Sequence, residues 1–106
     1  MSKDTSFCDY VVNDLLISVS GISSKAMFGG HGVYKDEKIF AIIVDGELYL
    51  KANNETKDFF ATHNSHQFTY SKKNGKTYAM NYWFVPEEIF EDREKFVEWV
   101  DMAVSV

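Results

Sequence analysis

The sequence predicts an α+β fold in which a mostly antiparallel sheet of about five to six strands, a meander plus a hairpin, packs against N-terminal, middle and C-terminal helices. Apolar residues recur at spacings of three and four near both ends of the chain, which is the period of amphipathic helices. Short runs rich in β-branched and aromatic residues fill the middle, where Asp-Gly and Asn-Gly pairs indicate tight hairpin turns. These patterns give the order α-β-β-β-β-α-β-β-α, and the short turns between neighbouring strands favour antiparallel pairing.

The first helix is predicted over residues 7–19. Asp4 or Ser6 is expected to cap its start, and Gly21 lies just past its end, where a left-handed terminating residue is common. Residues 20–24 are expected to form a loop. The apolar stripe of this helix consists of Cys8, Val11, Val12, Leu15, Leu16 and Val19.

Four short strands are predicted to follow as a meander, over residues 25–28, 33–35, 38–44 and 47–51. Gly29-Gly30-His31-Gly32 separates the first two strands, and its glycines favour a bulge or a close crossing of strands. Asp36-Glu37 is expected to form the next turn. Asp45-Gly46 predicts a type I′ turn, because that turn needs positive φ at both central residues. The unbroken apolar run within 38–44 predicts a strand buried on both faces.

A middle helix and a second hairpin complete the predicted sheet. Asn53-Asn54 is expected to cap a helix over residues 55–62 that buries Phe59 and Phe60. Strands over residues 67–71 and 76–85 then flank a second Asn-Gly turn, Lys72-Lys73-Asn74-Gly75.

Two short helical segments are predicted to end the fold. Pro86, the only proline, ends the preceding strand and opens one helical turn over residues 86–90. Asp92 is expected to cap the last helix, residues 93–104. The apolar stripe of that helix consists of Phe96, Trp99, Val100 and Ala103.

Size and composition predict one small globular domain over residues 1–106. The chain is 45% apolar and 16% aromatic, which suffices for a core and is far from the composition of disordered chains. Its longest apolar run, Ile39 to Val44, is too short to span a bilayer, so no membrane partner is expected. The single cysteine, Cys8, excludes an intramolecular disulfide and fits a reducing compartment. We therefore expect a cytoplasmic protein.

The net charge of −5 is unevenly distributed along the chain. Residues 1–19 hold one Lys and three Asp, residues 20–85 hold eight Lys and six acidic residues, and residues 86–106 hold two basic and seven acidic residues. Because basic residues that neutralise phosphates provide most non-specific nucleic-acid affinity, the acidic ends favour a protein partner over autonomous DNA binding. The basic turn formed by Lys72, Lys73 and Lys76 keeps a direct nucleic-acid contact open as an alternative.

The sequence contains no recognisable catalytic or metal-binding pattern. The segment Gly29 to Gly32 invites a phosphate-binding interpretation, but the known glycine-rich phosphate loops run into a helix, and a strand follows here. A small-molecule site at this segment is the less favoured alternative, with His31 as its candidate side chain. His63 and His66 are too few for a zinc site, and Cys8 on an apolar stripe has no base beside it in the sequence. The expectation is a non-enzymatic protein without a cofactor or metal.

The last predicted strand has large rings on both of its faces, in the run Tyr82-Trp83-Phe84. Either the core covers both faces, or Tyr82 and Trp83 belong to a surface for a partner, since Trp and Tyr are enriched at interfaces. The sequence leaves both interpretations open.

The ordered set of motifs is more specific than any one of them. It consists of Met27, Phe28, Gly29, Gly30, His31, Gly32, Val33 and Tyr34, then Phe40-Ala41, Asp45-Gly46, Leu48-Tyr49-Leu50-Lys51, Phe68-Thr69-Tyr70, Gly75-Lys76, Met80, Tyr82, Val85-Pro86-Glu87-Glu88 and Trp99. Taken in this order, the chain resembles the N-terminal domain of the TfoX/Sxy competence-regulator family over nearly its whole length. The run from Met27 to Tyr34 is the clearest family signature.

The resemblance implies a cytoplasmic bacterial protein that regulates transcription of genes for DNA uptake and has no enzymatic activity. TfoX acts as a coactivator alongside the cyclic-AMP receptor protein, so the resemblance implies a protein partner in the transcription machinery, and a homodimer is left open. The better-known members also have a C-terminal domain that resembles a helix-hairpin-helix module, although stand-alone N-terminal domains are common in the family. This chain ends at Val106, directly after the last predicted helix, so a stand-alone N-terminal domain is expected. Asp36-Glu37 departs from the family, which usually has a glycine in that turn.

Overall fold

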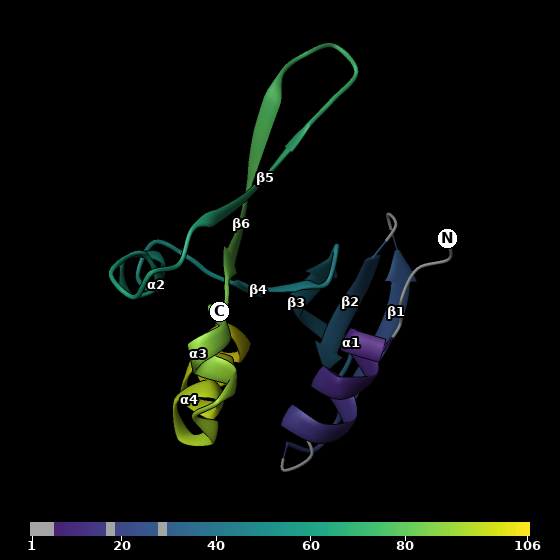
Figure 1. Ribbon diagram of the computed structural model, residues 1–106, viewed down its shortest axis with the longest axis vertical. Coiled ribbons are helices and arrows are strands. Elements are labelled where there is room, and N and C mark those ends of the chain that lie inside the picture. Colours follow the sequence, from purple (N-terminus) through teal and green to yellow (C-terminus); the bar gives the residue numbers. More distant parts are fainter. Residues whose placement is uncertain (1–5, 17–18, 28–29) are drawn as a thin grey trace.

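Six strands form one antiparallel sheet in the computed structural model, which describes residues 6–16, 19–27 and 30–106 (Figure 1). The strands are β1 (Ile22–Met27), β2 (Gly30–Lys35), β3 (Lys38–Val44), β4 (Glu47–Lys51), β5 (Gln67–Ser71) and β6 (Thr77–Phe84). Their order across the sheet is β1-β2-β3-β4-β6-β5, and every neighbouring pair is antiparallel. The predicted α+β class, the meander and the second hairpin are confirmed.

The helical segments lie at both ends of the chain and in the middle, as the sequence predicts. They are α1 (Ser6–Tyr10), the π-helical segment η1 (Val11–Leu15), α2 (Lys57–Ala61), α3 (Glu87–Phe90) and α4 (Arg93–Val104). The side chain of Asp92 accepts a hydrogen bond from the Lys95 amide at 3.2 Å, which confirms the predicted cap of the last helix.

The first helix is shorter than predicted. The amide of Leu16 donates to the carbonyl of Val11 at 3.0 Å, so the helix widens into a π turn and ends there, before Val19. The wider turn leaves Val11, Leu15 and Leu16 all buried in the core. The prediction of one regular α-helix over residues 7–19 is therefore wrong. The predicted cap Asp4 lies outside the described residues.

Two strands begin earlier than predicted. β1 begins at Ile22, so the predicted loop over residues 20–24 is wrong in its second half, and Gly21 adopts φ +78° at the turn before the strand. β2 begins at Gly30, so Gly30, His31 and Gly32 belong to the strand instead of interrupting the sheet. All three pair with β1, and His31 and Gly32 also pair with β3. A Cβ built on Gly30 would overlap the backbone carbonyl of Ile43, which explains why glycine suits this close approach of strands.

The middle segment also differs from its prediction at the boundaries. The Asn53 side chain accepts from the Glu55 and Thr56 amides at 2.8 and 2.9 Å, which confirms a cap, but residues 54–56 form a turn and α2 begins only at Lys57. Phe60 is buried, whereas Phe59 is only partly so. The last strand spans 77–84 and is one residue shorter at each end than predicted.

Two turns of the meander have the left-handed backbone of type I′ turns. Asp45 and Gly46 adopt φ values of +53° and +75°, which confirms the prediction made from the Asp-Gly pair. Asp36 and Glu37 adopt φ values of +51° and +72°. This turn therefore holds a glutamate in the left-handed region, which is strained for a residue with a side chain.

The second hairpin turn is built differently from the first. The Gly75 amide donates to the Lys72 carbonyl at 2.9 Å, and the Lys72 amide donates to the Lys76 carbonyl at 3.0 Å. Among the central residues only Gly75 is left-handed, which is the three-residue loop of a type I turn followed by a glycine. The hairpin is confirmed.

One cluster of buried side chains joins the sheet to the helices. On the helical side it includes Phe96, Trp99, Val100 and Ala103, the predicted stripe of α4. On the sheet side it includes Val33, Phe40, Ala41, Ile43, Leu48 and Leu50. The helices and the core therefore lie against one face of the meander.

A bulge in β3 decides what the other face of the meander presents. Val33 pairs with Ala41 and Tyr34 with Ile39, so Phe40 is an extra residue in its strand. Phe40 and the next residue, Ala41, are consequently both in the core. The alternation on either side then places Ile39, Ile42 and Val44 on the outer face.

No helix within the described ranges is long and apolar enough to cross a membrane.

Candidate functional site

The hairpin of β5 and β6, residues 67–84, projects from the meander as an arm (Figure 1). A hollow of about 610 Å³ lies between this arm and the outer face of the meander. We call it the groove. Its lining residues are His31, Ile39, Ile42, Val44, Phe68, Tyr70, Lys72, Met80 and Tyr82. This volume is within the range of about 300–1,000 Å³ found for ligand pockets.

One wall of the groove is aliphatic. Ile39, Ile42 and Val44 come from β3, and Ile39 and Val44 remain partly exposed. The predicted burial of this strand on both faces is thus confirmed for Ile42, which is 9% exposed, but wrong for Ile39 and Val44, which the groove leaves partly open. The bulge at Phe40 puts all three side chains on the same side.

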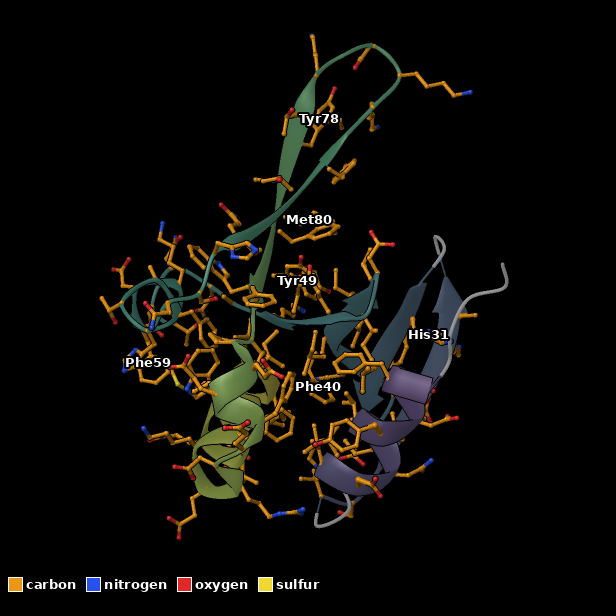
Figure 2. The ribbon with its side chains drawn as sticks, viewed as in Figure 1. His31, Phe40, Tyr49, Phe59, Tyr78 and Met80 are labelled. Atoms are coloured by element: carbon orange, nitrogen blue, oxygen red, sulfur yellow. The ribbon has the colours of Figure 1, made fainter. Side chains whose placement is uncertain are left out.

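The opposite wall is the aromatic face of the arm. Tyr70 and Tyr78 pair across the strands and stack at 5.6 Å between ring centroids, and Phe68 lies 6.3 Å from Tyr70. Tyr70 and Met80 are 38% and 39% exposed. Figure 2 shows Tyr78 and Met80 along the arm and His31 on the meander. Large apolar side chains exposed together in this way are characteristic of interaction sites.

The base of the arm is fixed by a buried tyrosine. Tyr49 packs edge-on against Phe68 at 4.9 Å and donates a hydrogen bond to the Glu47 carboxylate at 2.8 Å. Burial raises the pKa of the Tyr49 phenol above its ordinary value, and the neighbouring Glu47 raises that pKa further. The Tyr49 ring thus packs β4 against the base of the arm, while its neutral hydroxyl is held within β4 by Glu47.

The electrostatics of the groove favour an anionic or neutral occupant. Lys72 and His31 are the basic residues among its lining, and none of the nine lining residues is acidic. The Lys72 ammonium lies 5.0 Å from the centroid of the Tyr78 ring, which places this cation over an aromatic surface. Burial raises the pKa of Tyr82, and the nearby Tyr34 adds to this effect, so Tyr82 presents a neutral hydroxyl.

The predicted signature segment contributes to the groove only in part. His31 lines it, and Tyr34 lies near Tyr82. Gly30 allows the close approach of β2 to Ile43, and Gly32 pairs with Lys25 and Ile42. Met27 is the last residue of β1. Phe28 and Gly29 lie outside the described residues.

The two residues predicted as a partner surface lie on opposite faces of β6. Tyr82 lines the groove. Trp83 pairs with Leu50 and packs against the core, where its indole N–H has no hydrogen-bond partner among the described residues. Of the two, therefore, Tyr82 is the one that faces the groove.

The three lysines proposed for nucleic-acid contact lie at the tip of the arm. Lys72, Lys73 and Lys76 are all exposed, and Lys72 also lines the groove. No acidic residue occurs between Phe59 and Pro86, so the whole arm is free of carboxylates.

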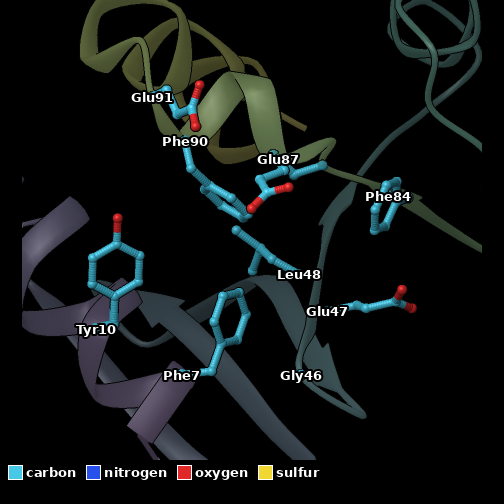
Figure 3. A pocket seen from close by; sticks show the side chains of 10 residues that line it. Phe7, Tyr10, Gly46, Glu47, Leu48, Phe84, Glu87, Phe90 and Glu91 are labelled. Carbon is cyan, nitrogen blue, oxygen red and sulfur yellow. The ribbon is translucent and has the colours of Figure 1, made fainter.

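A second, smaller hollow of about 350 Å³ lies between α1, α3 and the start of β4 (Figure 3). The Phe7 and Phe90 rings meet edge to face there, 5.8 Å apart. Glu47, Glu87 and Glu91 also line it. Sequence reasoning did not connect Glu87 and Glu91 with Glu47, because β4 and α3 are far apart in the chain.

The described residues form two hollows, and both have apolar side chains among their lining. Among the described residues, no three His, Cys, Asp or Glu side chains come together as metal ligands. Sequence reasoning missed the groove because it arises between segments distant in sequence. The alternation of Tyr78, Met80 and Tyr82 on one strand face was the signal that could have indicated it.

Residues 14–106 match the sequence pattern of the TfoX N-terminal domain. The chain belongs to the TfoX N-terminal domain family. This confirms the resemblance drawn from the ordered motifs, and the match includes all six strands of the sheet and both walls of the groove.

Two relatives match this TfoX N-terminal domain in sequence. Protein Sxy of Escherichia coli (strain K12) is 31% identical over 88 residues, which cover 83% of this chain and 42% of Sxy. DNA transformation protein TfoX1 of Aliivibrio fischeri (strain ATCC 700601 / ES114) is 30% identical over 71 residues, which cover 67% of this chain and 33% of TfoX1. The chain thus matches less than half the length of either relative.

Proposed function

We propose that this TfoX N-terminal domain is a non-enzymatic regulatory module that acts through protein contacts made at the groove. Its relatives Sxy and TfoX1 belong to a family of competence regulators, and TfoX1 is named a DNA transformation protein. The domain then works in the cytoplasm on the transcription of genes for DNA uptake, alongside a transcription activator such as the cyclic-AMP receptor protein.

The observation that supports this proposal most strongly is the character of the groove. It exposes Tyr70, Met80 and other apolar side chains without a cluster of reactive or metal-binding groups among the described residues. Aromatic side chains and methionines are enriched where proteins bind other proteins.

The proposal is tested in the host cell. Deletion of the gene is expected to change transcription of DNA-uptake genes, and the full chain is expected to restore it. A Met80→Asp chain, which places a charge in the groove, is expected not to restore this transcription. A Val106→Asp chain is the control and is expected to restore it, because Val106 is similarly exposed, at 37%, but lies outside the groove lining. Unchanged transcription and transformation after deletion would contradict the regulatory role.

Biochemical capture separates protein from nucleic-acid partners. The tagged full chain is expected to retain a protein from its own cytoplasm after nuclease treatment, and the Met80→Asp chain is expected to lose it. Loss of the partner on nuclease treatment alone would favour contact through DNA or RNA.

A direct nucleic-acid contact at the tip of the arm is the second candidate. Lys72, Lys73 and Lys76 are exposed there with no carboxylate in the arm. This function predicts DNA retention that weakens steeply with salt and on Lys73→Glu plus Lys76→Glu. The same charge reversal at Lys57 and Lys95, both exposed and outside the arm, is the matched control. Retention that does not depend on salt or on the arm lysines would exclude it.

A further inference from the structure

We infer that the groove binds an acidic amphipathic segment of a partner protein, with its apolar side chains between the arm and β3 and its carboxylates near Lys72. This inference rests on the proposed function, because it names the kind of partner that the regulatory module contacts. Four features of the described residues lead to it.

The first feature is that both walls are apolar and face one space. The aliphatic wall comes from the outer side of β3, and the arm provides rings and the thioether of Met80. A two-stranded arm is only marginally stable alone in water, so an apolar occupant would stabilise the arm as well as fill the hollow. Apolar side chains repeated along one face of a helix match such a groove.

The second feature is the sign of the charge around these walls. Lys72 is part of the lining. Outside the lining, Lys25 lies 5.7 Å from the centroid of the Tyr34 ring, and Tyr34 in turn lies near Tyr82. Because no lining residue is acidic, carboxylates beside the apolar face of a partner would meet Lys72 within the groove. The carboxylates of Asp45 and Glu47 lie outside the lining, near Tyr49 at the base of the arm, so the favourable end for an acidic partner is the Lys72 end. A basic partner would meet repulsion at the same places.

The third feature disfavours a second copy of the chain as the occupant. The acidic part of this chain is α4 and its surroundings, but the apolar stripe of α4, including Phe96 and Trp99, is fully buried and cannot enter another groove. Reciprocal exchange of arms would bring the lysines of each tip onto a groove whose lining already includes Lys72. Such like-charge contacts are unfavourable.

The fourth feature disfavours nucleic acid in the groove itself. Single-stranded nucleic acids bind on aromatic platforms with cations for the phosphates. Here one entire wall is aliphatic, from Ile39, Ile42 and Val44, and offers neither a ring nor a hydrogen-bond donor to a base. Leucine, methionine or phenylalanine side chains fit that wall better.

The experiment measures binding of two labelled helical peptides to the purified full chain by fluorescence anisotropy. Both have the same apolar residues at positions i, i+3, i+4 and i+7, and they differ only in whether Glu or Lys flanks these residues. The acidic peptide is expected to bind at least about tenfold more tightly than the basic one, and added salt should reduce this difference.

Variants of the chain locate the binding. Met80→Asp is expected to weaken the affinity for the acidic peptide at least about tenfold, whereas Val106→Asp is expected to leave this affinity unchanged. Lys72→Glu is expected to remove or reverse the preference for the acidic peptide, and Lys95→Glu on α4 is expected to leave it intact. Met80 and Lys72 are exposed, so these substitutions should not disturb folding, and circular dichroism checks this point.

Each other outcome overturns the inference. Equal binding of both peptides, or binding of neither, would show that the partner is not an acidic amphipathic segment. A dimer seen in light scattering that Met80→Asp dissociates would identify a second copy as the occupant. Binding of an oligothymidine that Met80→Asp abolishes would identify nucleic acid. In all these cases the transcription assay still reports separately whether the regulatory role holds.

Discussion

Substitution of Gly30 by alanine tests whether the glycine segment is architectural. The first atom that a Cβ at this position meets is the carbonyl oxygen of Ile43, with which it would overlap, followed by the Ile43 carbonyl carbon at 3.2 Å and the Val44 Cα at 3.4 Å. All three belong to the backbone of β3, so no side-chain rotation can relieve the contact. Strands β2 and β3 must separate or shift at this position.

The cost can be bracketed from the same geometry. Overpacking of a well-packed site costs about 1–3 kcal/mol, and contact with backbone puts Gly30→Ala at or above about 3 kcal/mol. This is a large part of the total stability of about 5–15 kcal/mol that is typical of a domain. The matched control is Gly46→Ala, where nothing lies within 4 Å and only the φ of +75° disfavours a side chain, at about 1–2 kcal/mol.

Urea denaturation followed by tryptophan fluorescence measures both variants, because Trp99 is buried in the core and reports its opening. Gly30→Ala is expected to lower the urea concentration at the unfolding midpoint much more than Gly46→Ala does, and the dependence of the unfolding free energy on urea should not change. If Gly30→Ala costs no more than Gly46→Ala, the reasoning from strand proximity is refuted.

Three further predictions concern the turns, caps and buried phenol. Glu37→Gly is expected to raise the free energy of unfolding by about 0.5–1 kcal/mol in urea titrations, because Glu37 has φ +72°; a lower value would mean that the turn is not strained. Asp92→Ala is expected to lower the free energy of unfolding by about 1 kcal/mol, because the α4 cap is lost, whereas Asp92→Asn is expected to keep most of the cap's contribution. Equal losses of stability in the two variants would argue against the cap. The raised pKa of Tyr49 means that the folded state holds the phenolic proton more tightly than the unfolded state, so stability is fully present below about pH 10 and falls above it. Tyr49→Phe is expected to flatten that fall in thermal-melting profiles against pH, and an unchanged slope would contradict the assignment.

The predicted elements were most accurate where local chemistry decides the backbone. Asp45-Gly46 gives a type I′ turn and Asp92 caps a helix, because each requirement involves only a few neighbouring residues. The first helix was less predictable. Its apolar spacing fitted an α-helix, but the π turn at Leu16 forms because it buries Leu15 and Leu16 together, which depends on the core they pack into.

The candidate site could be predicted only in fragments. Tyr82 and Lys72 were expected to contact partners of different kinds, and His31 was noted from its place among glycines. The structure puts all three around one groove. Their association depends on how the arm leaves the meander, which no local pattern encodes.

The sequence by itself determined the fold class, the succession of strands and the family of this protein, because period, turn chemistry and motif order are local properties read along the chain. The tertiary structure alone decided the outer face of β3. Its apolar run predicted burial on both sides, but the extra residue at Phe40 and the projecting arm leave Ile39 and Val44 on the wall of an open groove. Burial depends on which segments meet in space, and here the covering segment stands away from the sheet, so residues with the composition of a core form a surface.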